Sequence, residues 1–239
     1  MSHPEAAAES GADAAARSDA AGRPGPADLR GLVIDWGGVL TNSILSTVRS
    51  WVETDQIDWD SYVACMRPWL TEAYGGPEVA ANPVHALERG ECTVPEFERM
   101  FAARLTRTDG RPVPAEGLLG RMFAATKTVP AMYDLLRSAR AAGVRTCLLS
   151  NSWGSEWYDR TDFPALFDGV VISCEVGMRK PEPEIFQHAA QLIGLPPAAC
   201  VFVDDVEANI AAAEACGMTG VHHSDPAVTT ERVATLLSI

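Results

Sequence analysis

Five short runs of apolar residues stand out along the chain, and each is rich in Val, Ile, Leu or Phe rather than alternating with polar residues. Such continuous runs are typical of parallel strands that helices cover on both faces. The pattern therefore predicts five buried strands, at residues 32–35, 145–150, 169–173, 200–204 and 220–223.

Helical patterns separate the later strands. The segment 130–142 begins with a proline and is followed by a glycine, which is the usual asymmetry of helix ends. The segments 183–193 and 207–216 are likewise followed by glycine. Strands that alternate with helices imply right-handed crossovers. The predicted fold class is therefore α/β, with a doubly wound, Rossmann-like parallel sheet.

Residues 42–128 break this rhythm, because they show helical spacing and no convincing strand. Thr93 with Glu96 three residues later is a capping-box pattern for one of these helices. An insertion straight after the first strand is expected above the carboxyl ends of the strands, where open α/β sheets bind ligands. We interpret 42–128 as a helical cap inserted into a core of residues 29–41 and 129–239. A helical appendage with no part in catalysis is the alternative.

Residues 1–28 have a different composition, rich in Ala, Gly, Ser and Asp. They contain no apolar stretch of the kind found in a secretory signal. They also lack the aromatic and branched side chains that offset the entropy of an ordered chain. We expect a disordered tail.

The net charge of −13 over 239 residues narrows the choice of partners. It argues against nucleic acid and against an acidic membrane surface, because both would repel the protein. No run approaches the ~20 apolar residues that a membrane-spanning helix needs. The six cysteines are scattered without a C-x-x-C motif, as expected for reduced core residues of a cytoplasmic protein. The oligomeric state stays open.

Polar and charged residues end the predicted strands or follow them. Parallel strands place their carboxyl ends at one edge of the sheet, so these side chains are expected to meet in one crevice. Three carboxylates in one crevice repel each other unless a cation neutralises them, and oxygen ligands suit Mg²⁺ together with a substrate phosphate. The residues are Asp35, Ser150, Asn151, Lys180, Asp204 and Asp205.

The stretches DWGGVLT, LSNS, GMRKPEPEIF and FVDDVEAN occur in this order and resemble the four motifs of the haloacid dehalogenase-like hydrolase superfamily. The likeness covers nearly the whole chain after the tail. It is greatest to the branch that holds the phosphatase domain of soluble epoxide hydrolase and bacterial sugar-phosphate phosphatases. The resemblance implies a phosphomonoester hydrolase that acts on a small phosphorylated metabolite through an aspartyl-phosphate intermediate.

The resemblance also implies a role for each matching residue. Asp35 is the nucleophile, while Ser150 and the backbone of Asn151 hold phosphoryl oxygens. Lys180 steadies the charge on the nucleophile and on the phosphoryl group. The implied cofactor is Mg²⁺, held by Asp35, the carbonyl of Gly37, Asp204 and Asp205.

The residues taken singly allow simpler interpretations. Lys180 could be a surface lysine in a proline-rich loop, and Ser150 could cap a helix. Asp204 and Asp205 could cap the helix that begins at Glu207. The aromatic residues Trp153, Trp157 and Tyr158 follow the second motif and are candidates to line the substrate pocket.

Gly37 departs from the family pattern, because phosphatases of this family usually carry a second Asp two residues after the nucleophile. That acid protonates the leaving oxygen and then activates water. One explanation is a phosphatase with a good leaving group, such as a sugar 1-phosphate or an acyl phosphate, or with help from a cap residue or water. A second is a haloacid dehalogenase, which needs neither this acid nor Mg²⁺. A third is a protein that has lost catalysis and binds a phosphorylated ligand or a partner.

Overall fold

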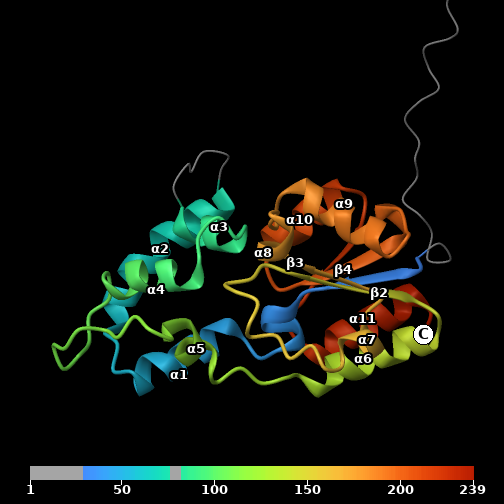
Figure 1. Cartoon of the computed structure of the whole chain (residues 1–239). Helices are drawn as coiled ribbons and strands as arrows, with labels where there is room; N and C mark the ends of the chain where they lie inside the picture. The colour runs from blue at the N-terminus through green and yellow to red at the C-terminus, as the bar shows by residue number, and fades with distance from the viewer. Residues whose placement is uncertain (1–28, 76–81) are drawn as a thin grey trace, which may run out of the picture.

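A computed structural model describes residues 29–75 and 82–239, with side chains assigned for 29–70 and 82–239 (Figure 1). The predicted disordered tail at residues 1–28 lies outside the described residues. Within the described part of the chain, no helix is both long enough and apolar enough to cross a membrane. All six cysteines have free thiols.

The five predicted strands form one parallel sheet in the order β3-β2-β1-β4-β5. The central strand β1 pairs with β2 on one side and with β4 on the other. The α/β fold class with a parallel sheet is thus confirmed. The strands are β1 (Gly31–Ile34), β2 (Arg145–Ser150), β3 (Gly169–Ile172), β4 (Cys200–Asp204) and β5 (Thr219–His222).

The strand bounds differ from the predicted ones by one residue at β1, β3 and β5. The difference matters at β1, which ends at Ile34 rather than at Asp35. The N–H of Asp35 still donates to the carbonyl of Val203, 2.9 Å away, before the chain turns away in the short segment Trp36–Leu40, where Gly37 and Gly38 have non-helical backbone angles. Asp35 is therefore held by the sheet through its backbone while its side chain stands at the sheet edge.

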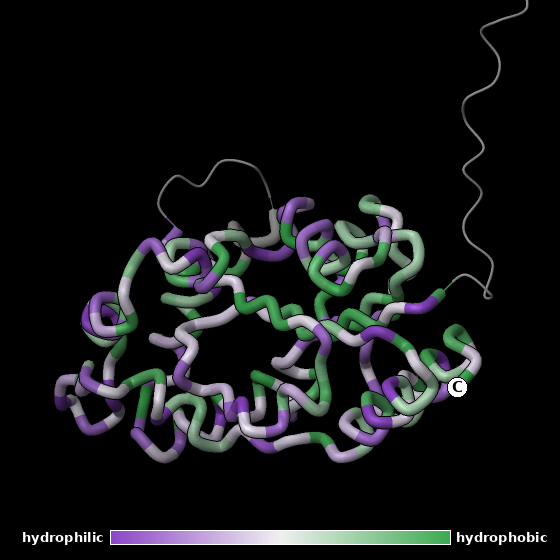
Figure 2. Tube along the Cα trace, turned by 45° about the vertical axis from the view of Figure 1, so that its right-hand side comes forward, coloured by the Kyte–Doolittle hydropathy of each residue, from purple (hydrophilic) through white to green (hydrophobic). Residues whose placement is uncertain are grey.

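Helices cover both faces of the sheet, as a doubly wound fold requires (Figure 1). Their apolar side chains form one hydrophobic cluster with each face of the strands. Figure 2 shows the strands as hydrophobic segments enclosed by helices of alternating polarity. One face carries α9 (Pro183–Leu192) and α10 (Glu207–Ala215), and the other carries α6 (Pro130–Ala141), α7 (Phe163–Leu166) and α11 (Pro226–Leu237).

The described part of residues 42–128 forms a second, helical lobe with its own hydrophobic cluster. The predicted capping box is present, because Glu96 N–H donates to Thr93 Oγ1 (3.4 Å) and Thr93 N–H donates to Glu96 Oε2 (2.8 Å). The helices of this lobe are α1 (Ile44–Thr54), α2 (Trp59–Gly75), α3 (Pro83–Glu88), α4 (Val94–Ala102) and α5 (Leu118–Phe123).

The two chain crossings between the lobes lie side by side. Thr41 and Thr128 form an isolated antiparallel bridge, and Asn42 N–H donates to the carbonyl of Lys127 at 2.9 Å. The sequence placed the boundaries of the cap at these positions. The division into two domains stays a prediction, which the separate hydrophobic cluster supports.

Candidate active site

Lys180 lies at the centre of the site and contacts the ends of three neighbouring strands. Its Nζ donates to Asp35 Oδ1 and to Asp204 Oδ2, both at 2.6 Å, and to the carbonyl of Leu149 at 3.1 Å. The Lys180 side chain is 1% exposed. Burial together with these contacts rules out a surface lysine, and it brings residues 145 positions apart into one ion-paired group.

Asn151 fixes the backbone of Lys180. The side-chain oxygen Oδ1 of Asn151 accepts from Lys180 N–H (2.8 Å), and its Nδ2 donates to the Lys180 carbonyl (2.9 Å). This paired contact anchors the loop after α8 (Ser173–Val176) to the end of β2. The Asn151 side chain therefore acts on Lys180, and its predicted contact with phosphate through the backbone stays a prediction.

Asp204, at the end of β4, is fully buried and hydrogen-bonded to the protein through both oxygens. Oδ1 accepts from Val206 N–H at 2.8 Å, and Oδ2 accepts from Lys180 at 2.6 Å. The amide Nδ2 of Asn209 donates to both oxygens at 3.1 Å. Helix α10 has no side-chain cap, so neither Asp204 nor Asp205 caps it.

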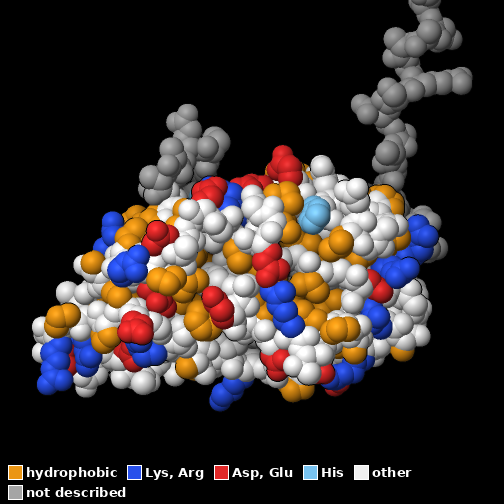
Figure 3. Space-filling view, in the orientation of Figure 1, with side chains coloured by type: hydrophobic (Ala, Val, Ile, Leu, Met, Phe, Trp, Pro, Cys, Tyr) orange, Lys and Arg blue, Asp and Glu red, His pale blue; other side chains and the backbone are white. Residues whose placement is uncertain are grey.

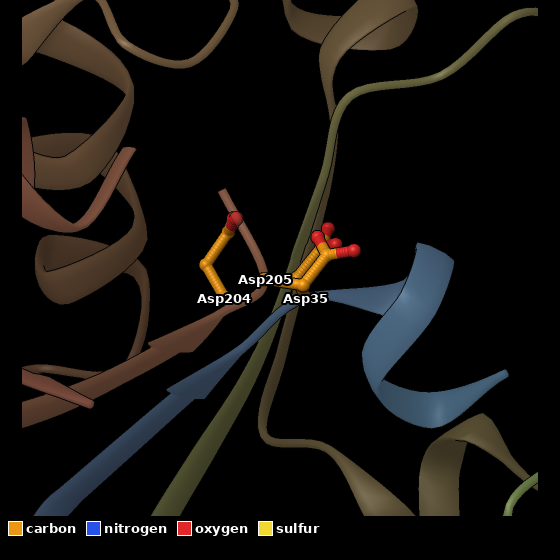
Figure 4. Close-up of side chains that lie close together, drawn as sticks. All are labelled: Asp35, Asp204 and Asp205. Atoms are coloured by element: carbon orange, nitrogen blue, oxygen red, sulfur yellow. The ribbon is translucent and has the colours of Figure 1, made fainter. Parts of the chain in front are cut away.

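Asp35, Asp204 and Asp205 form a carboxylate cluster at the strand ends (Figure 4). One carboxylate oxygen of each lies within 4.8 Å of the others. Gly38 makes room for Asp205, because a Cβ at Gly38 would clash with Asp205 Oδ2, and its φ of +80° is one that residues with a side chain rarely adopt. The donor set consists of oxygens only, which fits Mg²⁺.

The electrostatics of the cluster call for a further positive charge. Burial raises the pKa of Asp35 to about 7, and the charges of Asp204 and Asp205 add to this, although Lys180 opposes the shift. Burial and the Asp204 charge also raise the pKa of Asp205. Burial lowers the pKa of Lys180, but its two carboxylate partners outweigh burial and raise that pKa overall. One ammonium therefore does not neutralise three carboxylates.

The raised pKa of Asp35 predicts how stability changes with pH in metal-free protein. The folded-state pKa of about 7 lies above the value of 3.8 in an unfolded chain, so between these values the folded protein binds more protons. Its free energy of unfolding should therefore fall as the pH rises from about 4 to about 7. Thermal melts in EDTA across this range measure the slope. Mg²⁺ should reduce the slope, and an Asp35→Asn variant that keeps the full slope would contradict the assignment.

Ser150 ends β2 and is 2% exposed. Its Oγ lies 2.8 Å from the hydroxyl of Tyr158, so it is bonded across the site and does not cap a helix. Burial raises the pKa of the Tyr158 hydroxyl, which keeps it protonated, and either of the two hydroxyls can donate in this bond. Tyr158 thereby holds Ser150 at the edge of the cluster.

Gly37 has no strained backbone of its own. Its φ of −73° and ψ of 119° are open to any residue, and a Cβ there would meet only the Ile44 side chain, at 3.1 Å from Cδ1. The turn after Asp35 thus depends on Gly38 rather than on both glycines. The lack of a side chain at position 37 is consequently not imposed by the backbone.

A cavity of about 640 Å³ opens between the helical lobe and the strand ends. The floor of the cavity includes Asp35, Gly37 and Asp205. The cavity is also lined by the three aromatic residues that the sequence suggested, Trp153, Trp157 and Tyr158. The wall opposite this floor is formed by helices of residues 42–128. The helical lobe therefore covers the carboxylate cluster.

Two buried residues that the sequence analysis did not single out join the lobes beside the cavity. Arg179 Nε and Glu88 Oε2 are 2.6 Å apart, and their side chains are 3% and 5% exposed. Trp153 Nε1 donates to the other Glu88 oxygen at 3.3 Å. Because Arg179 precedes Lys180, this ion pair ties the lobe to the loop that carries the central lysine.

The structure thus combines an α/β fold with a carboxylate cluster beneath a helical lobe. The sequence profile of the haloacid dehalogenase-like hydrolases matches residues 29–217, which is most of the chain. The chain belongs to this family, and it is a hydrolase of the haloacid dehalogenase-like type.

Curated relatives cover several activities. A mouse acyl-CoA dehydrogenase family member 10 is 26% identical over 89% of this chain and 20% of its own length. The bifunctional epoxide hydrolase 2 of Sus scrofa is 27% identical over 81% of the chain and 36% of its own length. A sesquiterpene phosphatase of Aspergillus oryzae is 35% identical over 41% of the chain and 52% of its own length. The chain spans about half or less of each of these proteins.

Among solved structures, a haloacid dehalogenase family enzyme from Bacteroides thetaiotaomicron, in complex with magnesium and inorganic phosphate, superposes with a TM-score of 0.60. It is 22% identical, and the match covers 82% of this chain and 94% of that one. The likeness establishes the shared fold.

Proposed function

We propose that the protein is a Mg²⁺-dependent phosphomonoester hydrolase that acts on a small phosphorylated molecule through Asp35. The observation that carries this proposal is the contact of Lys180 with Asp35, beside Asp205 and in the lining of the cavity. A carboxylate, a fixed ammonium and a cation-demanding cluster are the parts that phosphoryl transfer uses.

Asp35 is suited to nucleophilic attack once it is ionised. Its carboxylate oxygen forms a bond to phosphorus while the bond from phosphorus to the leaving oxygen breaks, and the product is an aspartyl-phosphate. Water then attacks the phosphorus and releases phosphate and the free carboxylate. Lys180 holds Asp35 Oδ1 in place and favours its ionised form. Ser150 and the backbone of Asn151 hold phosphoryl oxygens.

Asp35 and Asp205, with the carbonyl of Gly37, would hold Mg²⁺. When bound, the ion supplies positive charge that favours ionised Asp35 and neutralises phosphoryl oxygens. Asp204 was also predicted as a ligand, but its oxygens already accept from Lys180, Val206 and Asn209. These bonds favour a different role for Asp204, the positioning of Lys180.

The alternatives fit the site less well. A haloacid dehalogenase needs no metal, so the acidic group of Asp35, Asp204 and Asp205 would serve no purpose in it. A protein that only binds a phosphorylated ligand has no need of a carboxylate 2.6 Å from a buried lysine. The likeness to the sesquiterpene phosphatase of Aspergillus oryzae also supports the proposal.

Phosphate release from a panel of phosphomonoesters, measured with Mg²⁺ and with EDTA, tests the function. We expect release in Mg²⁺, loss of release in EDTA and recovery when excess Mg²⁺ is added back. A halide assay with 2-haloacids runs in parallel. Halide release that persists in EDTA, with no phosphate release, would establish the dehalogenase instead. Heat stabilisation by inorganic phosphate without turnover would indicate the binding protein.

Gly37→Asp should add the acid that the chain lacks. The backbone at position 37 accepts a side chain, and the flexible end of Ile44 needs to move only slightly. General acid help contributes on the order of 10²–10⁴-fold in other enzymes. We expect a gain of about 10-fold or more on alkyl phosphates, whose leaving oxygens need a proton. The gain on aryl phosphates should be smaller. Equal gains on both would argue against an acid at this position, and Ile44→Val serves as a control for local repacking.

A further inference from the structure

The wall of the cavity that faces the carboxylate cluster is apolar. It is built by helices α1, α2 and α5 together with the loop after β2. Its apolar and aromatic side chains include Val48, Met66, Leu70, Phe123, Trp153 and Trp157. Hydrophobic side chains also lie at the surface of the helical lobe near its junction with the core (Figure 3).

Two polar side chains on the same wall, Glu88 and Trp157, are already bonded to the protein. Both oxygens of Glu88 are bonded, one to Arg179 and one to Trp153. Trp157 Nε1 donates to the carbonyl of Trp153 at 3.0 Å. A hydroxyl-rich substrate would have to compete with these bonds, and buried hydroxyls without partners are costly.

The volume of about 640 Å³ is typical of pockets that enclose drug-sized molecules. A phosphoryl group at Asp35 fills only a small part of it. The remaining space lies against the apolar wall. An apolar group that displaces water from this space gains binding free energy. The size and the apolar lining of the cavity therefore indicate a large, apolar leaving group.

We infer that the substrate is a phosphomonoester of a bulky, apolar hydroxyl compound, such as a long-chain alkyl or fused-ring aromatic alcohol, rather than a sugar phosphate. This inference rests on the proposed phosphatase function and specifies its substrate class. The apolar group lies between α2 and Trp157, and the phosphoryl group lies between Lys180 and Asp205. Selectivity comes from burial of the leaving group rather than from hydrogen bonds to it.

Kinetics on matched esters test the inference. Each pair has leaving groups of similar basicity, so that the missing acid at Gly37 affects both members equally. The first comparison is between phenyl phosphate and 2-naphthyl phosphate. The second is between glycerol 3-phosphate and a series of alkyl phosphates from butyl to octyl. We expect kcat/KM to rise up to about fourfold for each added methylene group until the cavity is filled. Rates that are flat along the series, or highest on glycerol or sugar phosphates, would overturn the substrate class.

Two variants at the mouth of the cavity connect the selectivity to this wall. Ile44 and Leu70 line the cavity and are 41% and 39% exposed, so Ile44→Gln and Leu70→Gln should fold normally. Both should flatten the rise along the alkyl series, because they should lower kcat/KM on octyl phosphate far more than on glycerol 3-phosphate. Leu45→Gln is the matched control, because Leu45 is 52% exposed and lies outside the cavity lining. If Leu45→Gln flattens the series as much, the wall is not the cause.

Binding without turnover separates this inference from the proposed function. Asp35→Asn protein in Mg²⁺ is titrated with octyl phosphate and with glycerol 3-phosphate, and quenching of Trp153 and Trp157 fluorescence reports occupancy. Tighter binding of octyl phosphate supports the apolar ligand even if the wild type hydrolyses none of the esters. Hydrolysis of esters with equal binding of both would leave the phosphatase standing and remove the substrate class.

Discussion

Asp35→Asn is expected to abolish phosphate release and to leave the fold intact. The substitution keeps the volume of the side chain but removes the nucleophilic carboxylate, so the loss should be on the order of 10⁴-fold or more. The amide oxygen can still accept from Lys180, whose other partners, Asp204 and the carbonyl of Leu149, remain. One negative charge fewer beside Asp204 and Asp205 lowers the repulsion in the cluster. The melting temperature in EDTA should therefore stay the same or rise.

Asp134→Asn is the control for this variant. Asp134 lies on α6 with a side chain that is 71% exposed, and it pairs with Arg137 three residues on. It should keep full activity and an unchanged melting temperature. Turnover by Asp35→Asn at more than about one hundredth of the wild-type rate would show that another group attacks phosphorus. A collapse of its melting temperature would show that Asp35 is needed for folding rather than for chemistry.

The sheet and the position of the site could be predicted because both follow from one pattern. Buried parallel strands read as unbroken apolar runs, and their carboxyl ends share one edge. Asp35, Ser150 and Asp204 were therefore expected to lie close together. Asp35 and Asp204 both contact Lys180, and Ser150 lines the same cavity. Residues near in sequence to a strand end are placed by the strand itself, with little freedom for the side chain to lie elsewhere.

What could not be predicted depends on contacts between distant segments. Glu88 and Arg179 are 91 positions apart, and nothing local in either segment marks a partner. Asn209 was quoted within a motif without a role, because its bond to Asp204 depends on how α10 begins. The sequence also did not show that Gly37 and Gly38 differ in their need for glycine. Only Gly38 requires it, because of its φ of +80°. Helix α11 is a different case, because it was not predicted although its start has a local signal. Asp225 is its N-cap and Pro226 is its first residue.

Lys180→Met is expected to remove activity and to destabilise the protein, which distinguishes it from Asp35→Asn. The methionine fills most of the space but leaves Asp35 and Asp204 buried without their cation. Removal of one partner from a buried ion pair typically costs about 3–5 kcal/mol. Lys127→Met is the matched control, because Lys127 is the other lysine of the chain and is exposed. It should melt and turn over like the wild type.

The destabilisation should also depend on pH and on Mg²⁺ in a way that simple misfolding would not. Without Lys180 the pKa of Asp35 loses the ammonium that opposes its upward shift, so it should rise further above its usual value. Protonated Asp35 needs no cation, and the melting-temperature difference from wild type should therefore shrink toward about pH 5 and grow toward about pH 8. Mg²⁺ should recover part of the difference at the higher pH by supplying charge to the same carboxylates. A difference that is constant with pH and unaffected by Mg²⁺ would mean that Lys180 stabilises the fold by packing, and that its charge does not control the ionisation of Asp35.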